Sequence, residues 1–215
     1  YGITSIYKFV AFYTFYKKAD SFQEENYSMF MEMKSSDNSI KTITHTTTKV
    51  GNKKIETDLI QGDETSPKPK HITYTDFNQK ICYQLSYDFS QNAYTYHDRT
   101  KDMVNEQEKE ELFKNHNLIK NQTLENIPSG LKEILLASLD PRYYQVSIRN
   151  RYYKTISITD DAKTKVQLNK DYLIEESNIK LENQNRIITT NYSYDYVQDH
   201  FKELKNPIES LPLHP

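Results

Sequence analysis

The chain has 215 residues, a formal net charge of −2 and a mean hydropathy of −0.86. Its basic residues occur only in short runs, which argues against a nucleic-acid-binding protein because such proteins usually carry a basic patch or stripe. No apolar run reaches the length of a membrane-spanning helix, and four glycines are too few for a glycine-rich phosphate loop.

The aromatic residues indicate the fold class. The chain contains 18 Tyr and 9 Phe but no Trp, and tyrosine, isoleucine and threonine favour strands because they pack well on a pleated surface. The length suits one large domain. We therefore expect a single α+β domain over residues 1–215, built mainly from antiparallel sheet.

Residues 3–18 form the most apolar segment and are predicted to be helical. Their apolar side chains recur at helical spacing, and further aromatic residues widen the stripe, so we expect this helix to be buried along most of its girth. The stripe consists of Ile3, Ile6, Tyr7, Val10 and Tyr13, widened by Phe9, Phe12 and Tyr16. The chain starts at Tyr1 rather than Met, which is compatible with a signal peptide or lipid anchor removed upstream.

Residues 27–97 read as a first group of strands. Residues 27–34 alternate, which places Tyr27, Met29, Met31 and Met33 on one face and Phe30 on the other. Gly51-Asn52 is a turn signal that predicts a hairpin between the following strands. Short polar turns continue the pattern, so a meander is expected up to residue 97.

The pattern changes over residues 104–139, which are predicted to be a helical insertion. Asn105 is a good helix N-cap, with Glu108 placed as its capping-box partner. A second group of strands is expected over residues 142–197, again separated by polar turns. The tail, residues 198–215, contains three prolines and is predicted to run irregularly across the surface.

Motifs for catalysis or metal binding are missing from the sequence. It contains no G-x-S-x-G, H-E-x-x-H, C-x-x-C or Walker motif. Cys82 is the single cysteine, so it is either a small strand residue or a reactive thiol. We expect no enzyme activity, no cofactor and no nucleic-acid partner.

Histidines are the remaining candidates for metal ligands. His45, His71 and His97 lie on predicted strands, where neighbouring strands can bring side chains together; the other histidines are His116, His200 and His214. The alternative is three separate strand histidines. With one cysteine and scattered histidines, we expect no bound metal.

Two sets of residues are candidates for binding a ligand or partner. Met29, Met31 and Met33 present flexible, polarisable side chains on one strand face, as an adaptable apolar surface requires; ordinary core is the alternative. The second set consists of tyrosines, which either pack with exposed hydroxyls or form a stacking surface. Its members are Tyr143, Tyr144, Tyr152, Tyr153, Tyr192, Tyr194 and Tyr196.

The order of the predicted elements, together with two segments, resembles the LolA/LppX-like family of bacterial envelope lipoproteins. The segments are Val166-Gln167-Leu168-Asn169-Lys170-Asp171-Tyr172-Leu173-Ile174 and, after a turn, Ile188-Thr189-Thr190-Asn191-Tyr192-Ser193-Tyr194. The resemblance implies a curved antiparallel sheet, or half-barrel, with helices over its concave apolar face. It also implies a lipid anchor on an upstream cysteine and an extracytoplasmic, membrane-anchored or secreted location in the cell envelope.

Two functions remain open under this resemblance. Some members of the family carry lipid, whereas others bind proteins, including a clostridial spore lipoprotein that acts on a cortex amidase. The first hypothesis is that the chain binds and regulates a protein partner in the envelope, such as a cell-wall or spore-cortex amidase. The second is that it carries a lipid or another apolar ligand. A carrier needs an open apolar cavity, and a partner-binding domain needs an exposed apolar or aromatic patch.

Overall fold

The computed structural model describes residues 2–21, 25–37, 41–60, 68–103, 105–114, 144–157 and 162–214. The chain divides into two compact units. The first contains Tyr1–Gln23, Met33–Ile40 and Leu118–Tyr192, and the second contains Glu24–Glu32, Lys41–Asn117 and Ser193–Pro215. Each unit is built on antiparallel strands, which confirms the predicted α+β class. The single-domain organisation stays a prediction.

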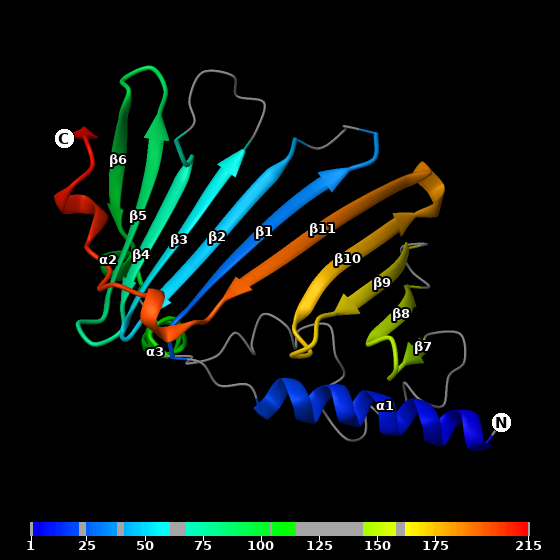
Figure 1. The fold of residues 1–215 in the computed structure, drawn as a ribbon. Coiled ribbons are helices and arrows are strands. Elements are labelled where there is room, and N and C mark those ends of the chain that lie inside the picture. The colour runs from blue at the N-terminus through cyan, green and yellow to red at the C-terminus, as the bar shows by residue number, and fades with distance from the viewer. Residues whose placement is uncertain are drawn as a thin grey trace. The chain divides into compact units, whose positions relative to one another are not determined.

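The second unit is a meander of antiparallel strands (Figure 1). The hydrogen-bonded order is β12-β6-β5-β4-β3-β2-β1. The bounds are β1 (Tyr27–Ser35), β2 (Ile43–Val50), β3 (Lys53–Ile60), β4 (His71–Asp76), β5 (Ile81–Asp88), β6 (Ala93–Asp98) and β12 (Leu213–His214). The predicted turn at Gly51 is confirmed: its φ of +56° lies in the left-handed region, which glycine adopts without a Cβ clash.

The core of the second unit lies on one face of this meander. Ile72, Leu85, Tyr87 and Tyr94 form a buried cluster there, with Leu85 0% exposed. Three apolar residues from the C-terminal segment also pack against this cluster: Ile208, Leu211 and Leu213. The opposite face also has buried residues, among them Thr47, Thr75 and Cys82.

The C-terminal segment is more ordered than the tail expected from its prolines. It contains the 3₁₀ helices η2 (Gln198–His200) and η3 (Pro207–Glu209) and ends in β12. β12 pairs in parallel with β6, and the Tyr94 N–H donates to the Pro212 carbonyl at 2.9 Å. Prolines are tolerated here because the segment is held mainly by buried side chains and by one short strand pairing. Such a segment needs few backbone N–H donors, which proline lacks.

Two short helices follow β6, namely α2 (Arg99–Asp102) and α3 (Glu106–Leu112). The Asn105 side chain accepts a hydrogen bond from the Gln107 N–H at 2.9 Å, so its predicted capping role is confirmed. The rest of the predicted helical insertion, residues 115–139, lies outside the described residues.

The first unit combines a long helix with the second group of strands. Its strand order is β11-β10-β9-β8-β7. The bounds are α1 (Gly2–Ser21), β7 (Tyr144–Ser147), β8 (Tyr152–Ser157), β9 (Ala162–Leu168), β10 (Ile174–Leu181), the 3₁₀ helix η1 (Glu182–Gln184) and β11 (Arg186–Asp195). None of the helices in the described part of the chain has the length and apolarity that a membrane crossing requires.

Phe15 joins α1 to the strands of the first unit. Its side chain is 0% exposed and packs in a cluster with Tyr153, Val166, Leu168 and Ile174. This cluster holds the buried side of α1 within the first unit. Helical periodicity shows that α1 has an apolar side but does not identify the surface that covers it.

Candidate binding site

α1 has two apolar faces, only one of which is buried. Ala11 and Phe15 are both 0% exposed, and Lys8 lies beside them at 8%. On another side of the same helix lie four exposed apolar residues: Ile6 (65% exposed), Tyr7 (45%), Val10 (46%) and Tyr13 (43%). We call these four residues the α1 apolar face. The expectation that the stripe is buried along most of its girth is therefore wrong.

The α1 apolar face is fixed by local contacts. The Ile148 N–H donates to the Tyr7 hydroxyl at 3.2 Å, which ties the helix to the end of β7. The Tyr13 ring stacks on Phe9 with centroids 6.2 Å apart, and Lys17 Nζ lies 5.7 Å from its centroid. Residues 6, 10 and 13 follow helical spacing and so form one continuous strip. A contiguous exposed apolar patch of this kind is typical of an interaction surface.

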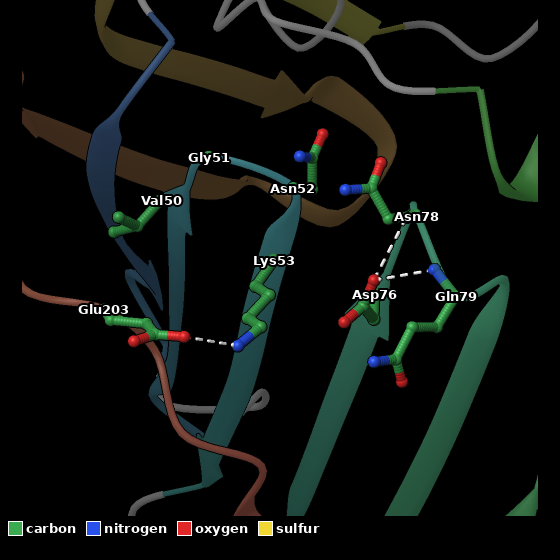
Figure 2. Close-up of a pocket in the computed structure, with 8 residues that line it drawn as sticks. All are labelled: Val50, Gly51, Asn52, Lys53, Asp76, Asn78, Gln79 and Glu203. Carbon is green, nitrogen blue, oxygen red and sulfur yellow. Dashed lines mark hydrogen bonds and ion pairs between the residues drawn. The ribbon is translucent and has the colours of Figure 1, made fainter.

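A polar hollow of about 450 Å³ lies at the turn end of the second unit (Figure 2). It lies between the β2–β3 turn, the β4–β5 turn and the C-terminal segment. Its lining is Val50, Gly51, Asn52, Lys53, Asp76, Asn78, Gln79 and Glu203. Most of these residues carry amide or charged side chains, so the hollow offers donors and acceptors to a hydrogen-bonding ligand.

Two interactions shape this polar hollow. The Asp76 carboxylate is 4% exposed, and its Oδ1 accepts the N–H groups of Asn78 at 3.0 Å and Gln79 at 2.9 Å (Figure 2). Lys53 Nζ donates to Glu203 Oε1 at 2.8 Å. This bond raises the pKa of Lys53 and lowers the pKa of Glu203, so both groups are charged when they face the hollow.

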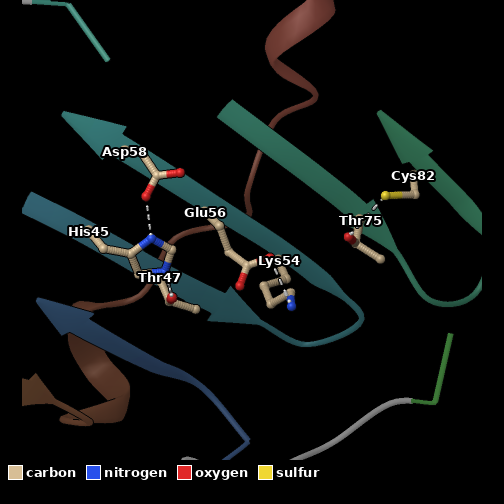
Figure 3. Close-up of polar contacts among 7 residues, drawn as sticks. All are labelled: His45, Thr47, Lys54, Glu56, Asp58, Thr75 and Cys82. Carbon is tan, nitrogen blue, oxygen red and sulfur yellow. Dashed lines mark hydrogen bonds and ion pairs between the residues drawn. The ribbon is translucent and has the colours of Figure 1, made fainter. Parts of the chain in front are cut away.

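On the face of the second unit opposite the Leu85 cluster, His45 lies between two oxygen atoms (Figure 3). Its Nδ1 lies 2.7 Å from Asp58 Oδ1, and its Nε2 lies 3.0 Å from Thr47 Oγ1. An acid, a base and a hydroxyl in this order are the parts of a nucleophilic triad. However, Thr47 is 0% exposed, so its hydroxyl does not reach a substrate. The arrangement orients His45 and gives no support to catalysis.

The three strand histidines have separate partners. His45 contacts Asp58, whereas His71 Nδ1 lies 3.2 Å from the Ser86 hydroxyl and His97 Nε2 lies 2.5 Å from Asp102 Oδ2. Among the described residues, no group of three metal-ligating side chains converges. The expected lack of a bound metal stays a prediction.

The candidate methionines differ in burial. Met29 is 3% exposed, Met31 and Met33 are half-buried, and Phe30 on the opposite face is 43% exposed. The predicted alternation along β1 is therefore confirmed. Tyr27 shares the methionine face; burial, with a further contribution from Glu56, raises its pKa to about 12. Met29 is thus a core residue, and only Met31 and Met33 retain exposed surface.

The candidate tyrosines are spread over several environments. Tyr153 is 1% exposed in the core of the first unit, and Tyr192 packs against the same core. Tyr152, Tyr194 and Tyr196 are half-buried, and Lys154 and Lys165 lie about 6 Å from the Tyr152 ring centre. Tyr144 lies in β7, and Tyr143 lies outside the described residues.

The α1 apolar face was missed as a site because sequence reasoning assigned it to the core. The available signal was the width of the stripe. A helix with apolar residues on nearly every side has more apolar surface than packing against one sheet can bury.

Comparisons with known proteins bear on the fold alone. No family model matches the chain, and no curated protein matches it. Among solved structures, it is similar to a DUF1329 family protein from Desulfovibrio piger ATCC 29098, with 8% identity, a TM-score of 0.33 and coverage of 88% of this chain and 93% of that one. It is also similar to the LolA superfamily protein NE2245 from Nitrosomonas europaea, with 11% identity, a TM-score of 0.30 and coverage of 91% and 96%. Both likenesses to solved structures are loose.

Proposed function

We propose that this chain is a non-enzymatic domain of the bacterial cell envelope that binds a protein partner through the α1 apolar face. One observation carries the proposal: four apolar residues at helical spacing, Ile6, Tyr7, Val10 and Tyr13, are 43–65% exposed while Ala11 and Phe15 on the same helix are fully buried. The buried face holds the helix in place, and the exposed face is presented to a partner.

The composition of the α1 apolar face favours a protein as the partner. Tyrosine is enriched in protein interfaces because it offers a large, rigid contact area with a polar tip. Helices with apolar residues at this spacing bind in apolar grooves of partner proteins. Lys17 and Lys18 are exposed at the end of α1, so the matching groove is expected to be apolar with an acidic rim.

The finer identity of the partner rests on the family resemblance in the sequence. A regulated cell-wall or spore-cortex amidase is the partner class that the resemblance implies, and an extracytoplasmic location follows with it. Tyr152 is a further contact candidate because it keeps exposed surface. The buried Thr47 hydroxyl beside His45 supports a function without catalysis.

Transport of a lipid or another apolar ligand is the competing function. It is favoured by the shared face of Met29, Met31 and Met33 on β1, since methionine adapts to varied apolar ligands.

Capture from the native envelope tests the proposal. The wild-type chain, Val10→Asp and Val197→Asp are cross-linked in envelope extracts, and the captured proteins and extractable lipids are identified by mass spectrometry. Val197 is a matched control, because it is a valine of similar exposure, 51% against 46% for Val10, and lies outside α1. We expect Val10→Asp to lose the partner and Val197→Asp to keep it, with melting temperatures close to wild type.

Two results would contradict the proposal. If Val10→Asp captures the same protein as wild type, the α1 apolar face is not the contact surface. If the wild type yields lipid in stoichiometric amount and no protein partner, the carrier function replaces the one proposed.

A further inference from the structure

A row of tyrosines crosses three strands of the second unit. Tyr74 on β4 stacks on Tyr83 on β5 with ring centroids 6.3 Å apart, and Tyr83 meets the edge of Tyr96 on β6 at 5.2 Å. Tyr74 pairs directly with Tyr83, and Tyr96 lies diagonally, opposite Leu85. Directly opposed residues of paired strands share a face, so the three rings form one aromatic row. It runs from the buried Tyr74, 4% exposed, to Tyr96, which is 42% exposed.

The tyrosine row and the polar hollow lie on the same face of the sheet. Tyr74 and Asp76 are two residues apart on β4 and so point to the same side, and Asp76 pairs with Lys53 on β3. Burial raises the pKa of Tyr74, and so does the charge of Asp76, while Lys53 acts in the opposite direction. The Tyr74 hydroxyl is therefore close enough to both charged groups of the hollow to sense them.

The charges beside this surface restrict its ligand. In the hollow, Lys53 faces two carboxylates, Asp76 and Glu203. Beside Tyr96, the Asp98 carboxylate lies 3.5 Å from Lys101 Nζ. The excess of negative charge in the hollow disfavours phosphates and other anionic ligands. Amide and carboxylate groups also disfavour a purely apolar ligand, because burying them without hydrogen bonds is costly.

We propose that the polar hollow and the tyrosine row form one binding site for a short, neutral oligosaccharide. Sugar hydroxyls both donate and accept hydrogen bonds, which suits the mixed lining: the exposed Glu203 carboxylate accepts, Lys53 donates, and the amides of Asn78 and Gln79 do both. The apolar C–H face of a sugar ring packs on an exposed aromatic ring, here Tyr96, while the tyrosine hydroxyl stays available for hydrogen bonds.

The dimensions agree with more than one sugar unit. Lys53 on β3 and Tyr96 on β6 are three strand spacings apart, about 14 Å across the sheet. They are also offset by four residues along the strands, about 13 Å, because Lys53 is in register with Ile81 and Tyr96 with Leu85. A monosaccharide does not bridge this distance, whereas a short oligosaccharide does. The site is independent of the proposed protein partner, because it lies in the second unit and uses no residue of α1.

Titration of the full chain with neutral tetrasaccharides tests the site, with chitotetraose and maltotetraose as probes and calorimetry as the readout. Tyr96→Ala and Gln79→Ala change the two ends of the site at exposed positions. Phe89→Ala is the matched control, since Phe89 is an exposed aromatic at 40% outside the row. We expect saturable binding of at least one probe, weakened about tenfold or more by each site variant, which corresponds to about 1.4 kcal/mol.

Binding that is weakened by Tyr96→Ala and by Gln79→Ala but not by Phe89→Ala supports one site that spans both features. If neither probe binds at millimolar concentration, or if either site variant binds like wild type, the proposal is overturned. It is also overturned if Phe89→Ala weakens binding as much as Tyr96→Ala.

Discussion

Replacing Phe15 with alanine is expected to destabilise the first unit strongly. The side chain is 0% exposed and packs among Tyr153, Val166, Leu168 and Ile174, which belong to three strands and have little freedom to collapse into the space left. Truncating a buried phenylalanine costs about 3–5 kcal/mol, as lost transfer free energy plus a cavity term. A loss of this size is a large share of the roughly 5–15 kcal/mol that stabilises a typical domain.

Urea denaturation, followed by circular dichroism, measures this loss. With a denaturant slope of roughly 2 kcal/mol per molar, the expected loss moves the midpoint down by about 2 M. Tyr13→Ala is the control on the same helix, because Tyr13 is 43% exposed and its truncation removes little buried surface. If Phe15→Ala and Tyr13→Ala shift the midpoint equally, α1 is not anchored through Phe15 and the assignment of its two faces is wrong.

Three further predictions follow from buried groups of the second unit. Tyr27 has its pKa raised to about 12, so the folded state keeps a proton that the unfolded chain releases above its ordinary value near 10; stability is then complete below pH 10 and falls towards pH 12. The free energy of unfolding is expected to fall by about 3 kcal/mol between pH 10 and pH 12 in the wild type, and this fall should be missing in Tyr27→Phe. If the melting temperature of both proteins depends on pH in the same way, the assignment is refuted. Burial also raises the pKa of the Cys82 thiol, which is 0% exposed; a thiol reagent should therefore label it slowly in the native protein and at once in denaturant, and fast native labelling would show that it is accessible. Deleting residues 207–215 removes β12 and the side chains that cover Leu85 and its neighbours. The shortened chain should therefore bind a hydrophobic dye and melt at a lower temperature. A variant that melts like wild type would show that the segment is dispensable for the core.

Local patterns in the sequence were enough to predict local structure. Alternation along β1 predicted the faces of Met29 and Phe30, and the structure shows one buried and the other exposed. Gly51-Asn52 predicted the β2–β3 turn, and Asn105 predicted the start of α3. These features depend on interactions between residues close in sequence, such as a turn conformation or a cap hydrogen bond, so the information lies within a few positions.

Contacts between distant segments were decided by the tertiary structure alone. Residues 2–21 carry apolar side chains on several sides of α1. The packing of Phe15 against Tyr153, Val166, Leu168 and Ile174 determined which side is buried and left the α1 apolar face exposed. Likewise, the register of β4, β5 and β6 aligned Tyr74, Tyr83 and Tyr96, although they are separated in sequence by 9 and 13 residues. The physical reason is the same in both cases: periodicity defines which side chains share a face, whereas the partner of that face depends on how the whole chain fills its core.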